Sequence, residues 1–243
     1  MGTTMRQGGS NGALVFSDAN KPWRVYGAFG EGAREYHIRA GLPVDDTTAR
    51  PTEFVSTLAG TSPVTAGQTS GYPLLITTGA TEYNGANVQL SGEHVKLVAG
   101  KEVFLRGKMI VSEEKTCDLL FGLCELKTDL LKGSVAHGIT ATSVEGIFFF
   151  KVSGATETTI YLKSYKDGTE VASVAVGTLG KTADIDLALW WDGVRVHAYV
   201  DDVEKAVIQG TLPDGDLTPS INFKTGAAAA ITLSVAELGF VVV

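Results

Sequence analysis

The charge of this 243-residue chain argues against nucleic acid as a partner, because 27 acidic residues against 20 basic ones give a formal net charge of −7 and nucleic acids are bound by clustered Lys and Arg. Only 19% of the residues are charged and 29 are glycine, a composition typical of many short strands joined by tight turns. No apolar stretch has the length of a signal-peptide core or a membrane helix, so we expect a soluble chain made in a cytoplasm, without a membrane partner.

Residues 1–72 are predicted to form an extended, glycine-rich N-terminal arm that precedes a β domain over residues 73–243. The arm contains four of the seven prolines and only short apolar pieces, so it cannot bury much surface by itself. Its scattered aromatic residues indicate docking on another surface, although an arm that wraps its own domain would show the same pattern. The residues expected to anchor a partner are Phe16, Trp23, Tyr26, Phe29 and Tyr36.

The strand pattern is nearly continuous from residue 73 onward. Short apolar or alternating runs are separated by turn pairs such as Asp167-Gly168 and Asp192-Gly193. The runs expected to form strands are 74–77, 88–90, 95–98, 102–112, 117–126, 147–152, 158–164, 171–176, 183–191, 194–200, 204–209, 217–223 and 231–243. Their number and spacing predict an all-β antiparallel sandwich. The long connection 126–146 is expected to be functional or a packed loop, and residues 128–132 within it have a helix-like pattern.

The clearest local signal is a β-hairpin over residues 184–200, with Asp192-Gly193 at its turn. Apolar and polar residues alternate from Val194 to Val200, so one face of this strand is expected to be buried. The adjacent Trp190 and Trp191 point to opposite faces unless a bulge intervenes, which places at least one ring outside the core. That ring either stacks on a sugar or covers a sheet edge or a subunit contact.

The two cysteines, Cys117 and Cys124, lie seven residues apart in one predicted strand. This odd separation puts them on opposite faces and about 20 Å apart at roughly 3.3 Å per residue. A disulfide needs Cα atoms within about 7 Å. Free buried thiols are therefore expected.

Several stretches resemble those of concanavalin A-like, laminin-G-like jelly rolls: Val103–Val111, Leu119–Leu123, Gly146–Lys151, Leu187–Asp201 and Leu217–Phe223. The order of the stretches over residues 73–243 is similar to that of a group of small tailed-phage virion proteins with such a domain. In that group Leu-Thr-Pro, here residues 217–219, precedes the penultimate strand and an Ala-rich turn precedes the last. The resemblance implies a structural part of a virion: a capsid cement or decoration protein, or a fibre component.

Enzymatic activity is not expected from the sequence motifs. Glycosidases of this fold need two carboxylates facing each other on the concave sheet, but the nearest approach to their Glu-x-Asp-x-x-Glu pattern is Asp184-Ile-Asp186, without either glutamate. The histidines are isolated, and no nucleophile elbow or metalloprotease motif accompanies them. His197 falls on the polar face of its strand, as an ordinary exposed residue would.

Calcium is the one cofactor for which the sequence offers candidate ligands. It binds six to eight oxygens, and turn carboxylates are available at Asp201, Asp202, Asp214 and Asp216. Asp in turns is equally explained by hydrogen bonds to its own backbone. No other metal site or cofactor is expected.

These observations predict a non-enzymatic decoration protein on the exterior of a phage capsid, made in the host cytoplasm. Its partner would be the major capsid protein, and homo-oligomers, with a trimer at a lattice three-fold, would multiply weak contacts. The alternative is a carbohydrate-binding, lectin-like module of a fibre or a secreted protein, in which Trp190 or Trp191 stacks on a sugar.

Overall fold

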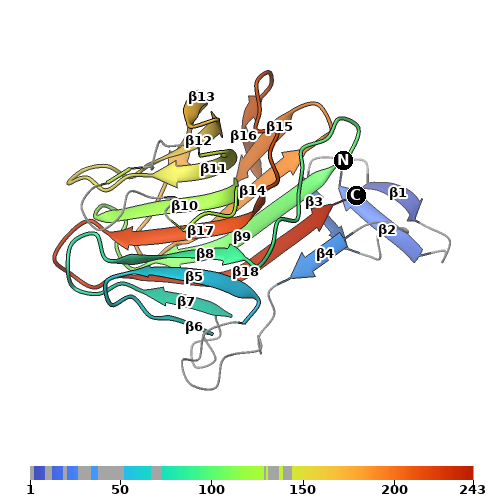
Figure 1. Ribbon diagram of the computed structural model, residues 1–243. Coiled ribbons are helices and arrows are strands. Elements are labelled where there is room, and N and C mark those ends of the chain that lie inside the picture. The colour runs from blue at the N-terminus through green and yellow to red at the C-terminus, as the bar shows by residue number, and fades with distance from the viewer. Residues whose placement is uncertain are drawn as a thin grey trace.

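The computed structural model describes residues 52–66, 73–128, 130, 137–138 and 144–242, and only the backbone of Ala66 and of four strands nearer the N-terminus. Within this part of the chain, every regular element is a strand. None of the described residues forms a helix with the length and hydropathy needed to cross a membrane. The fold is therefore all-β, and two large antiparallel sheets stack face to face (Figure 1).

The first large sheet has seven strands in the order β13-β12-β11-β10-β17-β8-β5. Its strands are β5 (Phe54–Ala59), β8 (Gly85–Leu90), β10 (Cys117–Cys124), β11 (Gly146–Lys151), β12 (Thr159–Lys166), β13 (Thr169–Thr178) and β17 (Thr218–Thr225). The central strands β10, β11 and β17 are buried along their whole length, because both of their faces are covered. We call this element the seven-stranded sheet.

The second large sheet has eight strands, ordered β16-β15-β14-β9-β18-β7-β6, with β4 also paired to β18. Its strands are β4 (Arg34–His37), β6 (Val64–Ala66), β7 (Leu74–Thr77), β9 (Val103–Val111), β14 (Asp184–Trp191), β15 (Val196–Val200), β16 (Val203–Ile208) and β18 (Thr232–Val242). Burial alternates along β9 and β18, because only one face of each lies against the core.

The core lies between the two sheets, and almost every strand of the sheets contributes every second side chain to it. Phe121 of β10 and Phe149 of β11 stack at its centre with 6.4 Å between ring centroids. On the facing sheet, Gly107 of β9 leaves room for this ring, since a Cβ atom there would lie 2.5 Å from Cζ of Phe121. The inward-facing residues of the two sheets thus form one continuous apolar layer.

The N-terminal 72 residues contribute strands to the sandwich as well as a small sheet of their own. Strands β5 and β6 belong to the two large sheets, and β4 pairs with the last four residues of β18. The small sheet consists of β1 (Thr3–Gly8), β2 (Ala13–Asp18) and β3 (Lys21–Tyr26). The backbone of β3 lies close to β9 and β14 (Figure 1).

Two local predictions are confirmed. Strands β14 and β15 form the expected hairpin, and Trp190 and Trp191 pair with His197 and Val196. Both cysteines are free and buried, with Cys117 in the core and Cys124 on the opposite face of β10. The run 95–98 differs from its prediction, because Val95 makes only an isolated bridge to Leu217. Most of residues 128–132 lie outside the described residues.

Candidate functional site

A strip of buried polar side chains runs along the outer face of the seven-stranded sheet. On β17, Ile221 and Phe223 point into the core, so the residues that alternate with them point outward. The residues of β8 and β10 that pair with these outward-facing residues point to the same face of the sheet. We call the following buried residues the polar strip: Asn87, Gln89, Asp118, Thr218, Ser220, Asn222 and Lys224.

Gln89 is fully hydrogen-bonded and ties the strip to the chain that follows β10. Its Nε2 donates to the carbonyl oxygen of Glu125 and to Oγ of Ser220, both at 2.8 Å. Its Oε1 accepts from the backbone N–H of Lys127 at 2.9 Å and from Nδ2 of Asn87 at 3.2 Å. These contacts fix the amide planes at the middle of the strip.

Asn87 and Asn222 are directly opposite each other on β8 and β17. Nδ2 of Asn87 also donates to the carbonyl oxygen of Lys127 at 2.5 Å. The Oδ1 atoms of both asparagines, however, are buried without a hydrogen-bond donor. A buried acceptor left unpaired costs about 1–3 kcal/mol, and native proteins normally satisfy such groups. The pair therefore presents two adjacent acceptors that a hydroxyl-bearing ligand or water can satisfy.

Asp118, His137, Tyr83 and Lys224 gather at one end of the strip. The fully buried Asp118 accepts from the backbone N–H of Ser153 at 2.6 Å, and its Oδ2 lies 3.0 Å from Nδ1 of His137. The His137 ring lies 4.8 Å from that of Tyr83, and Nζ of Lys224 lies 5.5 Å from the Tyr83 centroid. Burial lowers the pKa of Lys224, with the nearby Asp118 opposing that shift.

Tyr83 in this cluster has a strained backbone. Its φ of +68° lies in the left-handed region, which is costly for a bulky residue and is more frequent at functional sites than elsewhere. His137 and Tyr83 are both partly exposed. This end of the strip therefore borders solvent.

Glu125, Lys127 and Glu145 lie at the other end of the strip. Oε1 of Glu125 is 2.8 Å from Nζ of Lys127 and accepts from the backbone N–H of Glu145 at 3.1 Å. Glu125 follows Asp118 by seven residues and lies just after the end of β10, so these two residues are at least about 20 Å apart at roughly 3.3 Å per residue. Glycosidase pairs lie roughly 5–9.5 Å apart, so Asp118 and Glu125 are too distant to form one.

An apolar cluster borders the polar strip on the same face of the sheet. Phe148 stacks against Tyr165 at 5.7 Å and contacts Phe150 edge-on at 6.5 Å. Leu130 and Val144, from the connection between β10 and β11, are fully buried in this cluster. Leu130 and Val144 thus pack on the apolar part of this face.

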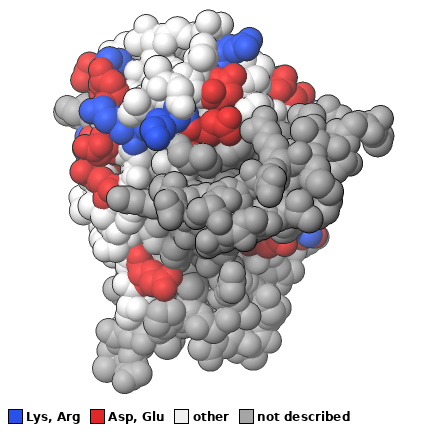
Figure 2. Space-filling view, turned by 90° about the vertical axis from the view of Figure 1, so that its right-hand side faces the viewer, with Lys and Arg blue, Asp and Glu red and all other residues white. Residues whose placement is uncertain are grey.

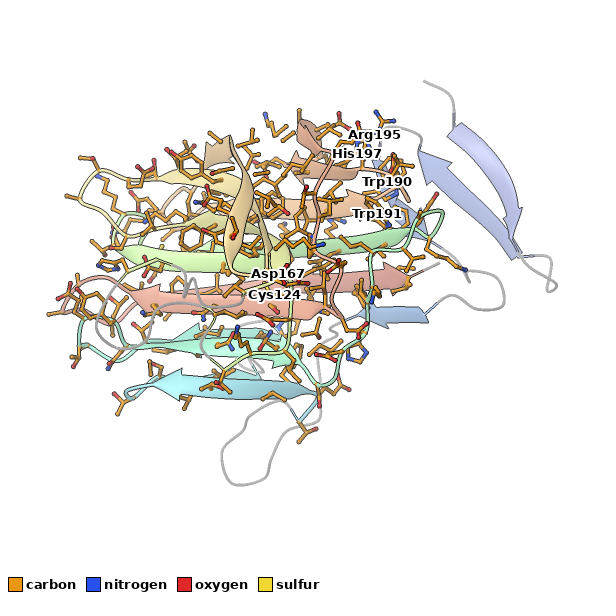
Figure 3. All side chains as sticks on the ribbon, turned by 45° about the horizontal axis from the view of Figure 1, so that its top comes forward. Cys124, Asp167, Trp190, Trp191, Arg195 and His197 are labelled. Atoms are coloured by element: carbon orange, nitrogen blue, oxygen red, sulfur yellow. The ribbon has the colours of Figure 1, made fainter. Side chains whose placement is uncertain are left out.

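The two tryptophans proposed for sugar stacking have different positions (Figure 3). Trp191 is packed in the core and its Nε1 donates to the carbonyl oxygen of Val98 at 3.1 Å, so the prediction of a sugar platform is wrong for this residue. Trp190 faces outward on the eight-stranded sheet, with Phe104 on one neighbouring strand at 5.9 Å and His197 on the other at 4.7 Å. Both rings are roughly parallel to the indole, and the indole Nε1 is buried without a hydrogen-bond acceptor.

His197, next to Trp190, is held between two carboxylates. Its Nδ1 lies 3.0 Å from Oε2 of Glu204, and its Nε2 lies 3.1 Å from Oδ2 of Asp192. Tyr199 also donates to Glu204, at 3.1 Å. The expectation of an ordinary exposed histidine is therefore wrong, because the hairpin turn and β16 both contact this ring.

The acidic candidates belong to ion pairs or turns, and charged side chains of both signs are interspersed on the face that Figure 2 shows. Asp186 pairs with Arg106, and Asp184 lies 3.0 Å from Lys108, all on the eight-stranded sheet. The calcium candidates Asp201 and Asp214 bind a backbone N–H and Lys166, respectively. Within the described residues, no group of three or more His, Cys, Asp or Glu side chains is arranged to hold a metal ion.

The predicted arm anchors are not among the described side chains. The side chains of Phe16, Trp23, Tyr26 and Tyr36, as well as all of Phe29, lie outside the described residues. The sequence analysis in turn missed the polar strip. Its signal was the alternation of polar and apolar residues along β17 and β8, two strands that are buried on both faces.

Comparison with known proteins identifies the fold. No family model and no curated protein matches the sequence. Among solved structures, a point-mutant form of the Emp46p carbohydrate recognition domain has a TM-score of 0.60 at 8% identity, covering 84% of this chain and 95% of that one. A Bacillus licheniformis β-glucanase gives 0.59 at 11%, covering 85% and 97%. Peanut lectin gives 0.57 at 10%, covering 87% and 97%.

These likenesses confirm the predicted antiparallel sandwich and place it among concanavalin A-like jelly rolls. Both lectins and enzymes are among the structures with this fold, and the Emp46p domain is known in metal-free and potassium-bound forms. At identities near 10% the likeness extends to the fold alone. The chain is thus a concanavalin A-like jelly roll in architecture.

Proposed function

We propose that this protein is a non-catalytic, lectin-like binding module whose ligand is a glycan bound at the polar strip. The observation that carries the proposal is the pair of unpaired, buried acceptors, Oδ1 of Asn87 and Oδ1 of Asn222. Glycans present closely spaced hydroxyl donors, and a site built to pair with such groups discriminates strongly against ligands that lack them. Tyr83 and His137 would contact the ligand at the open end.

The absence of catalysis is part of this proposal. Asp118 is the one carboxylate of the polar strip, and it already accepts from Ser153 and faces His137. Asp184 and Asp186 lie on the other sheet and face Lys108 and Arg106. A lectin-like role needs only the hydrogen-bonding groups that the strip contains.

A glycan array followed by calorimetry tests this function. The full chain should bind a defined glycan, and Asn222→Ala and Asn87→Ala should each weaken binding at least tenfold. Ser164→Ala is the matched control, because Oγ of Ser164 is also buried and unpaired. Unlike the two asparagines, Ser164 lies on the core side of its sheet, as Ile160 and Leu162 of the same strand do. Binding by none of the array glycans, or equal losses in all three folded variants, would reject the proposal.

A virion structural role is the second candidate, and the separate sheet β1-β2-β3 favours it. A small sheet outside the sandwich is a suitable unit to dock on a capsid exterior through the predicted anchors Trp23 and Tyr26. Because β5 and β6 belong to the sandwich, the informative truncation removes residues 1–30 and leaves Phe54–Ala66 in place. Cosedimentation with undecorated phage capsids should then be lost, as it should be in Trp23→Ala. Capsid binding that survives both changes would show that the arm is not needed for it.

A further inference from the structure

Most donor groups of the polar strip are already used within the protein. Both N–H groups of the Gln89 amide, and both of the Asn87 amide, donate to oxygen atoms of the chain. The hydroxyls of Thr218 and Ser220 each donate to a backbone carbonyl oxygen at 2.9 Å. The side-chain atoms of the strip that are buried without a partner are instead the amide oxygens of Asn87 and Asn222. The strip therefore calls for hydrogen-bond donors on its ligand.

His137 adds an acceptor at the end of the strip that borders solvent. Its Nδ1 lies 3.0 Å from Oδ2 of the fully buried Asp118. A carboxylate only accepts hydrogen bonds, so the hydrogen of the neutral imidazole belongs on Nδ1. Nε2 of the same ring is then an acceptor.

The charges at this end are unfavourable for an anion. The ammonium group of Lys224 is buried, and Lys224 is directly opposite Asp118 in the sheet, so the two charges offset each other. Glu82 adds a second carboxylate, with its Oε1 3.8 Å from Nε2 of His137 and its side chain 47% exposed. A ligand that arrives from solvent therefore meets the charge of Glu82.

The other end of the strip has the same excess of carboxylates. Nζ of Lys127 lies 2.8 Å from Oε1 of Glu125 and offsets that charge. Glu145 instead accepts from the backbone N–H of Gly215 at 2.7 Å. Each end thus pairs one lysine with one carboxylate and adds a second carboxylate, in a chain of net charge −7.

We infer that the ligand of the polar strip is an uncharged glycan, whose hydroxyls donate to Asn87, Asn222 and His137, and that acidic glycans are excluded. This inference rests on the proposed glycan-binding function. Directly opposite residues of a sheet have Cβ atoms about 4.5–5.5 Å apart, so two hydroxyls of one sugar can reach both amide oxygens. A carboxylate or sulfate group brings only acceptors and negative charge, and both are already in excess at this site.

Calorimetry with matched glycans tests the inference. Each neutral glycan that binds is compared with its C6-oxidised form, in which a carboxylate replaces a primary alcohol. The oxidised form should bind at least tenfold more weakly. Equal or tighter binding of the oxidised form would overturn this inference and leave the glycan-binding function standing, whereas binding of no glycan in either form would overturn both.

A pair of variants separates the charge of the site from the charge of the whole chain. Glu82→Gln should reduce the preference for the neutral glycan at least twofold, because it removes the exposed carboxylate beside His137. Glu237→Gln is the matched control: Glu237 is also about half exposed and has a similarly weak ion pair, with NH1 of Arg106 at 3.7 Å, but it lies on the eight-stranded sheet. Equal effects of the two variants would overturn exclusion by the site.

The tautomer of His137 is measured without any ligand. Nitrogen-15 NMR of the full chain near pH 8 should place the ring hydrogen on Nδ1 and show Nε2 as an unprotonated nitrogen. The His137→Gln variant assigns the signals. A hydrogen on Nε2 would overturn the role of His137 as an acceptor for the glycan.

Discussion

Burial determines the chemistry of several individual side chains in this protein. Lys151 is fully buried, and its Nζ donates to the carbonyl oxygens of Lys115 and Cys117 at 2.5 and 2.8 Å. Burial lowers the pKa of Lys151, against the opposing effect of the nearby Cys117. The same desolvation raises the pKa of Cys117 to about 12 and that of Cys124 even further. Charged forms are thus disfavoured at all three positions.

Both thiols should be unreactive in the native protein. The thiolate is the reactive form, and burial raises both pKa values far above neutral pH. We expect no reaction with a thiol reagent such as DTNB at pH 8 within minutes, and two thiols per chain after denaturation in guanidinium. Rapid labelling of the folded protein would show that one cysteine is accessible.

Asp184 and Asp186, which are two residues apart on β14, should contribute unequally to stability. Asp186 is largely buried and accepts from Nε of Arg106 at 2.9 Å, so Asp186→Asn should lower the free energy of unfolding by about 1–3 kcal/mol. Asp184 is half exposed beside Lys108, and exposed pairs contribute about 0–1 kcal/mol. Urea unfolding of Asp184→Asn and Asp186→Asn measures this difference; equal losses would contradict it.

At the scale of elements, close backbone approaches hold the hairpin β14–β15 against the rest of the sandwich. Gly193 at its turn has a φ of +90°, and the backbone N–H of Gly100 donates to its carbonyl oxygen at 3.2 Å. Asp192 accepts from the backbone N–H groups of Val194 and Arg195 at 2.8 and 2.6 Å. The turn is therefore fixed both by its own residues and by a distant loop.

Gly193→Ala should destabilise the protein more than Gly92→Ala. The two glycines have similar φ values, +90° and +96°, so backbone strain of about 1–3 kcal/mol is common to both variants. A Cβ atom at Gly193 would lie 2.8 Å from the backbone nitrogen of Gly100, whereas one at Gly92 would meet only His94 at 3.5 Å. Thermal unfolding compares the two; a lower Tm for Gly92→Ala would refute the steric argument.

At the scale of the whole molecule, carboxylate pairs at the surface make stability depend on pH. The hydrogen bond from Lys181 lowers the pKa of Glu113, and that from Lys166 lowers the pKa of Asp214. The pKa of Glu157 is likewise lowered, by its hydrogen bond with Thr159. The unfolded chain therefore takes up protons first as the pH falls.

The Tm should be highest near neutral pH and should fall in acid. The contribution of these carboxylates is fully present above their ordinary pKa values of 3.8 and 4.5 and is lost as the pH falls through the lower folded-state values. Calorimetry from pH 7 to pH 3 measures the loss. The Tm of Lys181→Met should shift less between these pH values than that of the wild type, because Glu113 has then lost its partner; a Tm that rises in acid would contradict the assignment.

Local patterns in the sequence were enough to predict the all-β class, the hairpin β14–β15 and the opposite faces of Cys117 and Cys124. Each of these depends on the alternation of side chains within one strand or on the residues of one turn. The same alternation showed that one of Trp190 and Trp191 faces outward. The resemblance to jelly rolls then predicted the sandwich that the solved structures confirm.

Only the tertiary structure decided which strands are neighbours and what their outer faces contain. Asn87 and Asn222 are far apart in the chain but directly opposite in the sheet, and Asp118 meets His137, which lies 19 residues further along the chain. Residues 54–66 belong to the sandwich because β5 pairs with the edge of β8 and β6 pairs with the edge of β7. Strand pairing is a long-range choice among many similar apolar runs, so it depends on how the whole core packs and not on any local pattern.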